Sequence, residues 1–153
     1  MPAQAPPLTR VRARKAADDS FIERLSALAF AEFSADPGHS TLQMARAGRT
    51  WVAERGTLAV GFAVVRSTGA FRAELCAIAV EEHARGLGVA AALLAKIENA
   101  LARAGTNELT LHTAEANASA LDLFSKRGFL PERRLPRFYR GMYDAWAMRK
   151  SIV

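Results

Sequence analysis

The sequence predicts a single α/β domain built around a mixed β-sheet. The chain has 153 residues, 50% of them hydrophobic and 24% charged, which is the size and balance of one globular domain. Segments in which apolar and polar residues alternate predict strands, and segments with apolar residues every three or four positions predict helices. Three predicted strands joined by short turns precede a strand–helix–strand unit. The sheet should therefore contain both antiparallel and parallel neighbours.

The first third of the chain should supply one strand and two helices. Residues 1–7 are rich in proline, and we expect a flexible arm there, ahead of a domain over 8–153. Asp18 and its polar neighbours offer a helix N-cap, and the sequence around Pro37 should end that helix. The predicted elements are a strand over 8–16, a helix from about 21 to 36, and a short helix over 41–47.

The middle of the chain has the pattern of an antiparallel meander. Arg55-Gly56 and Ser67-Thr68-Gly69 are turn-forming sequences between alternating segments. The predicted strands cover 50–54, 58–66 and 71–80.

After Val80 the pattern changes to a crossover of strand, helix and strand. A polar loop that contains glycine leads into an alanine-rich helix over 87–104, which Gly105 should end. The strand at 108–113 should lie parallel to the strand before the loop, with a right-handed crossover. A helix over 117–127 and a hairpin over 129–152, turning near 136–141, complete the order β-α-α-β-β-β-α-β-α-β-β.

Composition and charge exclude several classes of protein. The net charge is +6, with 17 Arg and 4 Lys, which favours partners that carry phosphate or carboxylate groups. The one cysteine, Cys76, cannot form a disulfide within the chain, and three scattered histidines give no zinc-ligand pattern. No apolar run approaches the roughly 18 residues of a membrane span, and residues 1–7 lack the pattern of a secretory signal. We therefore expect a cytoplasmic protein that uses no metal.

The loop before the alanine-rich helix carries the strongest chemical signal. Gly86 and Gly88 let the backbone approach an anion closely, and the following helix presents free N–H groups and the positive end of its dipole. A phosphate or pyrophosphate cradle is the expected use. No Lys follows Gly88, which excludes the Walker A pattern. The dinucleotide fingerprint is formally matched by Gly86, Gly88 and Ala91, but it belongs to a first βαβ unit, and here three antiparallel strands come first.

A third phosphate-binding pattern, R/Q-x-x-G-x-G/A, is matched by Arg85, Gly88 and Ala90. A second motif lies downstream, Asn117-x-x-Ala120-x-x-x-Phe124-x-x-x-Gly128-Phe129. With these motifs, the apolar strand 76–80, the Leu93-Leu94 pair and the closing segment 144–148, the chain resembles the GNAT superfamily of acyl-CoA-dependent N-acetyltransferases over residues 8–152. The resemblance implies the GNAT fold and acetyl-CoA, or another acyl-CoA, as the acyl donor.

The resemblance also implies which residues hold the donor. In the family two parallel strands splay apart and the pantetheine arm lies in the gap, where Asn117 matches a residue that hydrogen-bonds this arm. Phe124 belongs to the same motif, and Lys126 is a candidate for the 3′-phosphate on charge alone. The backbone that should pair with pantetheine is that of Ile78, Ala79 and Val80. The backbone that should hold the pyrophosphate is that of Arg85, Gly86, Leu87, Gly88, Val89, Ala90 and Ala91.

Amine acetylation needs a base for the amine, a donor for the oxyanion and a proton or hydrogen bond for the leaving thiolate. His112 and Glu74 are the candidate bases, and a backbone N–H at Ile78 or Ala79 is the expected oxyanion donor. No covalent enzyme intermediate is required, because binding both substrates supplies the proximity.

The residue at position 124 departs from the family. The usual general acid there is a Tyr, whereas Phe124 has no proton to donate. Tyr139, in the C-terminal hairpin, is the replacement candidate. Cys76 has no triad partners that the sequence supports, and we expect it to be a small buried residue.

The predicted function is direct transfer of acetyl to a primary amine, with a small amine, an amino acid or a protein N-terminus as acceptor. Part of the first helix and residues 34–47 should wall the acceptor pocket, as the resemblance implies. Phe124 keeps open a CoA-binding module without turnover, and the charge of +6 keeps open a nucleic-acid-binding domain, which no aromatic–basic stripe favours. A homodimer is left open, and no membrane partner is expected. The aromatic residues expected in the core are Phe30, Phe33, Trp51 and Phe71.

Overall fold

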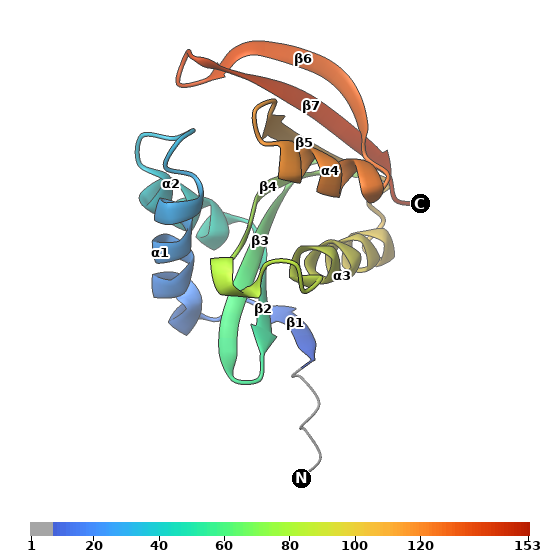
Figure 1. Ribbon diagram of the computed structural model, residues 1–153. Helices are drawn as coiled ribbons and strands as arrows, with labels where there is room; N and C mark the ends of the chain where they lie inside the picture. Colours follow the sequence, from blue (N-terminus) through green and yellow to red (C-terminus); the bar gives the residue numbers. More distant parts are fainter. Residues whose placement is uncertain (1–7) are drawn as a thin grey trace.

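The computed structural model describes residues 8–153 and confirms the predicted α/β fold and its order of elements (Figure 1). The arm predicted over 1–7 lies outside the described residues. Seven strands form one sheet in the order β1-β2-β3-β4-β5-β7-β6. The strands are β1 (Thr9–Ala13), β2 (Arg49–Arg55), β3 (Leu58–Gly69), β4 (Arg72–Val80), β5 (Glu108–Ala114), β6 (Leu130–Tyr139) and β7 (Tyr143–Ser151). The helices are α1 (Asp19–Ala29), α2 (Pro37–Ala47), α3 (Val89–Arg103) and α4 (Ala118–Lys126), with single 3₁₀ turns at Ala16–Asp18 and Glu82–Ala84.

Strand pairing confirms the predicted mixture of directions. In the described sheet β4 and β5 run parallel, and every other neighbouring pair is antiparallel. The meander of β2, β3 and β4 follows from their short turns, and α3 makes the crossover from β4 to β5.

Two apolar cores lie on the two faces of the sheet. α3 and α4 cover one face, where Leu93, Ile97 and Phe129 are buried. α1 and α2 cover the other, where Ile22 and Phe62 are buried, and Figure 1 shows these two helices on the opposite side from α3. From Val60 to Val65, β3 supplies alternate residues to both cores, which explains why residues 58–65 carry no polar side chain.

The boundary between the first two helices differs from the prediction. α1 ends at Ala29 instead of near residue 36, because Phe30 leaves the helical conformation. α2 begins at Pro37, four residues earlier than predicted. Proline suits a first helical position, since it needs no acceptor for an N–H and its φ is already set. The Asp-Pro-Gly sequence therefore starts a helix, and residues 30–36 form a loop that reaches the site described below.

Asp18 does not cap α1 through its side chain, which corrects the prediction. Its carboxylate accepts two hydrogen bonds from the Arg12 guanidinium, at 2.8 and 2.9 Å, and one from the Lys15 backbone N–H at 2.8 Å. The Arg12 hydrogen bonds are the largest cause of a lowered pKa for Asp18, and burial opposes them. This pair ties β1 to the start of α1.

The prediction for Phe71 was wrong. β3 continues to Gly69, three residues beyond the predicted end. Its last four residues are exposed to water, where polar side chains are compatible with a strand. The turn therefore falls at 70–71, where Phe71 is 61% exposed. Trp51 is buried as predicted.

Candidate functional site

The candidate site lies where the two parallel strands part. β4 and β5 pair over residues 72–75 and 108–111. At Cys76, β4 has one residue more than β3, since Val64 pairs with Ala77 and Val65 with Leu75. A bulge bends its strand and disrupts the ladder, so the strands diverge beyond this point. The bulge also changes which face each side chain takes, because Leu75 belongs to the α3 core and Ala77 to the α1–α2 core.

Beyond the bulge, β4 presents a backbone edge to the gap. The N–H of Glu81 donates to the Val60 carbonyl at 2.8 Å, which fixes the phase of the ladder with β3. Residues that alternate with the bonded ones turn their N–H and C=O groups to the other edge. This alternation directs Ala79 to β3 and turns the backbone of Ile78 and Val80 to the gap. An extended ligand can add to such an edge as a further strand.

A glycine loop and a helix N-terminus lie at the end of this edge. Gly86 and Gly88 have φ of +76° and +79°, and a Cβ at either position would meet nothing within 4 Å. The left-handed backbone therefore favours glycine, and the space in front of the loop is open. The first i→i−4 hydrogen bond of α3 runs from the Ala92 N–H to the Gly88 carbonyl at 3.0 Å. The N–H groups before it lack helical acceptors and favour an anion; they belong to Val89, Ala90 and Ala91.

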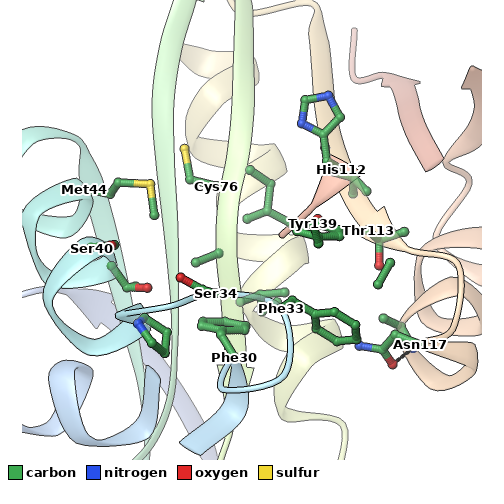
Figure 2. Close-up of a pocket in the computed structure, with 18 of the residues that line it drawn as sticks. Phe30, Phe33, Ser34, Ser40, Met44, Cys76, His112, Thr113, Asn117 and Tyr139 are labelled. Atoms are coloured by element: carbon green, nitrogen blue, oxygen red, sulfur yellow. Dashed lines mark hydrogen bonds between the residues drawn. The ribbon is translucent and has the colours of Figure 1, made fainter. Parts of the chain in front are cut away.

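Asn117 is held at the start of α4. Its side-chain oxygen accepts a hydrogen bond from the Ala120 N–H at 3.2 Å and so caps the helix. Since this hydrogen bond occupies the oxygen, the NH₂ group of the side chain remains available, and it can donate a hydrogen bond to a ligand. Figure 2 shows Asn117 and His112 at opposite ends of one cavity.

Two adjoining cavities follow the gap, with volumes of about 230 and 530 Å³. The strand-gap cavity, the first, is lined by Phe30, Phe33, Ser34, Pro37, Ser40, Thr41, Met44, Leu75, Cys76, Ala77, Ile78, Leu111, His112, Thr113, Ala114, Asn117, Ala120, Phe124 and Tyr139. The loop cavity, the second, is lined by Ala29, Phe30, Phe33, Ile78, Ala79, Val80, Ala84, Arg85, Gly86, Gly88, Val89, Ala90, Ala91, Asn117, Ser119, Ala120, Leu123 and Phe124. The two cavities share the lining residues Phe30, Phe33, Ile78, Asn117, Ala120 and Phe124, so together they extend from His112 to the glycine loop.

Glu74 and His112 lie together at one end of this path. The Glu74 Oε1 atom is 3.6 Å from His112 Nδ1, and His112 is the first residue of β5 beyond the part paired with β4. The other carboxylate oxygen of Glu74 accepts hydrogen bonds from the Arg66 guanidinium at 2.8 and 3.2 Å. The Glu74 side chain is 16% exposed and that of His112 is 35% exposed, so the carboxylate lies behind the imidazole. The structure brings the two predicted bases together as a pair.

The β6–β7 hairpin brings Phe138 and Tyr139 to the same end. Three residues of β6, 136–138, lie opposite the single residue Asp144 of β7. The Asp144 carboxylate accepts a hydrogen bond from the Arg137 N–H at 2.9 Å, which holds this wide bulge. The turn, predicted at 136–141, consequently lies at 140–142. The bulge places the Phe138 ring centroid 4.9 Å from that of His112.

Tyr139 is half-buried between aromatic rings. Its ring centroid lies 4.9 Å from that of Phe138 and 5.5 Å from that of Phe33. Burial, and then the negative charge of Glu74, raise the pKa of Tyr139 to about 12. The phenol is therefore neutral at physiological pH and able to donate a hydrogen bond.

Two further side chains of the site carry no usable proton at neutral pH. Phe124 is buried, lines both cavities and packs edge-on against Phe129 at 5.7 Å. Burial is the largest cause that raises the pKa of Cys76 to about 11, so its thiol stays protonated and is a poor nucleophile. Cys76 lines the strand-gap cavity, where its thiol contributes an uncharged side chain.

Most of the predicted donor-site residues line the loop cavity, and two do not. Leu87 is 51% exposed and lies outside the cavity lining. Lys126 is exposed, with its Nζ atom 2.9 Å from the Asp122 carboxylate, and it lines neither cavity.

Part of the first helix was expected at the acceptor pocket, but Phe30 and Phe33 were expected in the core. Both residues line the two cavities, because α1 ends before them. Met44 lies within the segment expected to wall the pocket, and Ser40 and Thr41 accompany it on α2. No sequence signal marked the Phe residues, since a buried helix face and a pocket wall have the same apolar pattern.

Within residues 8–153, no group of three His, Cys, Asp or Glu side chains is arranged to hold a metal ion. No helix of this part of the chain is long and apolar enough to cross a membrane.

Comparisons with known proteins agree with this geometry. Residues 13–129 match the model of the "Acetyltransferase (GNAT) family". N-alpha-acetyltransferase MAK3 of Arabidopsis thaliana is 30% identical over 79 residues, which are 52% of this chain and 42% of that protein. The match thus spans less than half the length of the plant protein.

Solved structures share the fold at low sequence identity. Ard1 from Thermoplasma volcanium has a TM-score of 0.86 and 21% identity, over 95% of this chain and 98% of that chain. A GNAT family acetyltransferase from Elizabethkingia anophelis, solved with acetyl-CoA bound, has a TM-score of 0.79 and 18% identity, over 94% and 97% of the two chains.

Proposed function

Because the chain belongs to the GNAT acetyltransferase family, we propose that it transfers acetyl from acetyl-CoA to a primary amine by direct attack within a ternary complex. The observation that carries the proposal is the open edge of β4, which lines the same cavity as the glycine loop. An edge, a loop and a helix N-terminus in this order suit an extended arm that ends in a pyrophosphate.

The donor would be held mainly by backbone groups. Ile78 and Val80 would pair with the pantetheine amides along the gap, and the N–H groups after Gly88 would bind the pyrophosphate. Asn117 would donate its amide N–H to the pantetheine arm. Lys126 would have to leave Asp122 to reach the 3′-phosphate, so we assign it the weakest part of the binding.

His112 would take the proton of the acceptor amine. A neutral imidazole is suited to this at physiological pH. The carboxylate of Glu74 beside it would stabilise the imidazolium that forms, and the two Arg66 hydrogen bonds hold that carboxylate in place.

The remaining two tasks fall to Ile78 and Tyr139. The Ile78 N–H, turned to the gap, would stabilise the oxyanion as the amine attacks the thioester. Tyr139 would donate a hydrogen bond to the leaving thiolate. Full proton transfer to a thiolate with a pKa of about 8.5 is uphill from a phenol with a pKa of about 12, so a hydrogen bond is the role that fits.

The acceptor class that the relatives favour is the α-amine of a polypeptide, since the Arabidopsis relative is named an N-alpha-acetyltransferase. Small primary amines remain an alternative acceptor class, because they would react with the thioester in the same way. Dependence on acetyl-CoA favours a cytoplasmic location.

Two measurements test the proposal. Calorimetry should detect acetyl-CoA binding, and a thiol reagent should detect CoA release when peptides or small amines are added. Binding without CoA release on a broad amine panel would support a CoA-binding module without turnover. Absence of binding would refute the assignment of the loop.

A further inference from the structure

Resting on the proposed function, we infer that the acceptor carries no charge, apart from the reacting amine, on the part that enters the strand-gap cavity, and that carboxylates are rejected most strongly. The acceptor class is a primary amine on a neutral body, such as a polypeptide whose first side chain is uncharged. A free amino acid does not belong to this class, because it carries a carboxylate beside the amine.

The lining of the strand-gap cavity carries the inference. Among the described residues 8–153, those that line it include no Asp, Glu, Lys or Arg. Phe30, Phe33 and Met44 form the wall on the side of α1 and α2. A charge placed there would lose its water without an oppositely charged Asp, Glu, Lys or Arg in the lining to pair with, and such transfers are costly.

The same wall offers neutral hydrogen-bonding groups. The hydroxyls of Ser34, Ser40 and Thr41 lie along the loop and the first turns of α2, all in the lining of the cavity. Hydroxyls both donate and accept, so they match the amide groups of a peptide backbone without requiring a charge.

Because of Glu74, the cavity should disfavour an anionic acceptor more strongly than a cationic one. Its carboxylate lies behind His112, and its negative charge reaches the cavity wall, where it contributes to the raised pKa of Tyr139. This field repels a carboxylate and attracts a cation. The expected order of reactivity is therefore neutral body first, cationic body second and anionic body last.

Closely matched amines test the order by the rate of CoA release at saturating acetyl-CoA. Phenylalaninamide is compared with phenylalanine, which replaces a neutral amide by a carboxylate beside the amine. Rates for this pair are expressed per concentration of neutral amine, because the α-carboxylate also makes the amine more basic. Glutamine α-amide is compared with isoglutamine, which has a side-chain carboxylate of nearly the same shape. Methioninamide is compared with argininamide, whose guanidinium is not acylated. We expect kcat/KM to fall at least about tenfold in each carboxylate pair and less in the arginine pair.

Each outcome decides a separate point. Equal rates within the carboxylate pairs, or faster reaction of the carboxylates, would overturn the inference and leave the acetyltransferase assignment standing. A larger loss with argininamide than with isoglutamine would refute the role given to Glu74. No CoA release with any compound, although acetyl-CoA binds, would refute the proposed function itself.

Discussion

Replacing Gly88 by aspartate should remove most acetyl-CoA binding while the fold remains intact. Gly88 has a φ of +79°, and a Cβ there meets nothing within 4 Å. Asparagine and aspartate tolerate this backbone conformation best among the other residues, so the strain costs roughly 1 kcal/mol. For a domain of this size that corresponds to a fall in Tm of about 2–4 °C.

The loss of binding should come from charge. A carboxylate about 5 Å from a phosphate charge, at an effective dielectric constant near 20, is repelled by about 3 kcal/mol. A free energy of that size is roughly a hundredfold in Kd. Gly88→Asn adds almost the same shape without the charge, and its Kd should rise far less.

Gly56→Asp is the matched control for position. Gly56 also has a left-handed backbone, with a φ of +64°, and a Cβ there also meets nothing within 4 Å. It lies in the β2–β3 turn, outside the lining of both cavities. Calorimetric titration gives the Kd, and thermal unfolding gives the Tm of the three variants.

The reasoning fails if Gly88→Asp binds acetyl-CoA as Gly88→Asn does. It also fails if Gly56→Asp weakens binding equally, because the effect would then reflect general destabilisation.

Four further predictions follow from the site and the fold. His112→Ala should lower kcat by about 10²–10⁴ and leave the Kd of acetyl-CoA nearly unchanged, as steady-state kinetics and calorimetry will measure. Tyr139→Phe should lower kcat and remove an absorbance titration centred near pH 12, and Phe124→Tyr on that background should restore part of the rate by returning a hydroxyl to the path between the cavities. Because the pKa of Cys76 is raised to about 11, alkylation by iodoacetamide should be slow at pH 7 and rise about tenfold per pH unit until near that value. The lowered pKa of Asp18 stabilises the fold above the unfolded pKa of about 4 and loses that effect as the pH falls, so Asp18→Asn should cost about 2 kcal/mol in denaturant unfolding at pH 7 and much less near pH 2.

Each of these has a contrary result. An unchanged kcat for His112→Ala removes the imidazole from the mechanism. A titration near pH 12 that persists without Tyr139 shows that the wrong tyrosine was assigned. Rapid alkylation of Cys76 at pH 7, or equal destabilisation by Asp18→Asn at both pH values, would contradict the surroundings described for those groups.

The spacing of the apolar residues was enough to predict the order of strands and helices, because it differs between the two kinds of element. Short turns join antiparallel neighbours, so the meander and the crossover could also be predicted from the sequence. The glycine loop was also visible, because only glycine takes its left-handed backbone freely at residues 86 and 88.

The end of α1 was not visible in the same way. Phe30 and Phe33 continue the apolar pattern of the helix, yet they belong to a loop and to the cavity wall. A pattern of apolar residues shows that side chains avoid water, and it cannot tell a core from a pocket.

The amino-acid pattern was sufficient to predict the fold class, the order of strands and helices, and the loop suited to a phosphate group. These depend on neighbours in the chain, where periodicity and backbone preference act. Contacts between distant segments set the parting of β4 and β5 at the Cys76 bulge, the pairing of Glu74 with His112, and the β6 bulge that brings Phe138 beside His112. These depend on register between strands that are distant in sequence. A single extra residue moves every later side chain to the other face, and no local pattern records it.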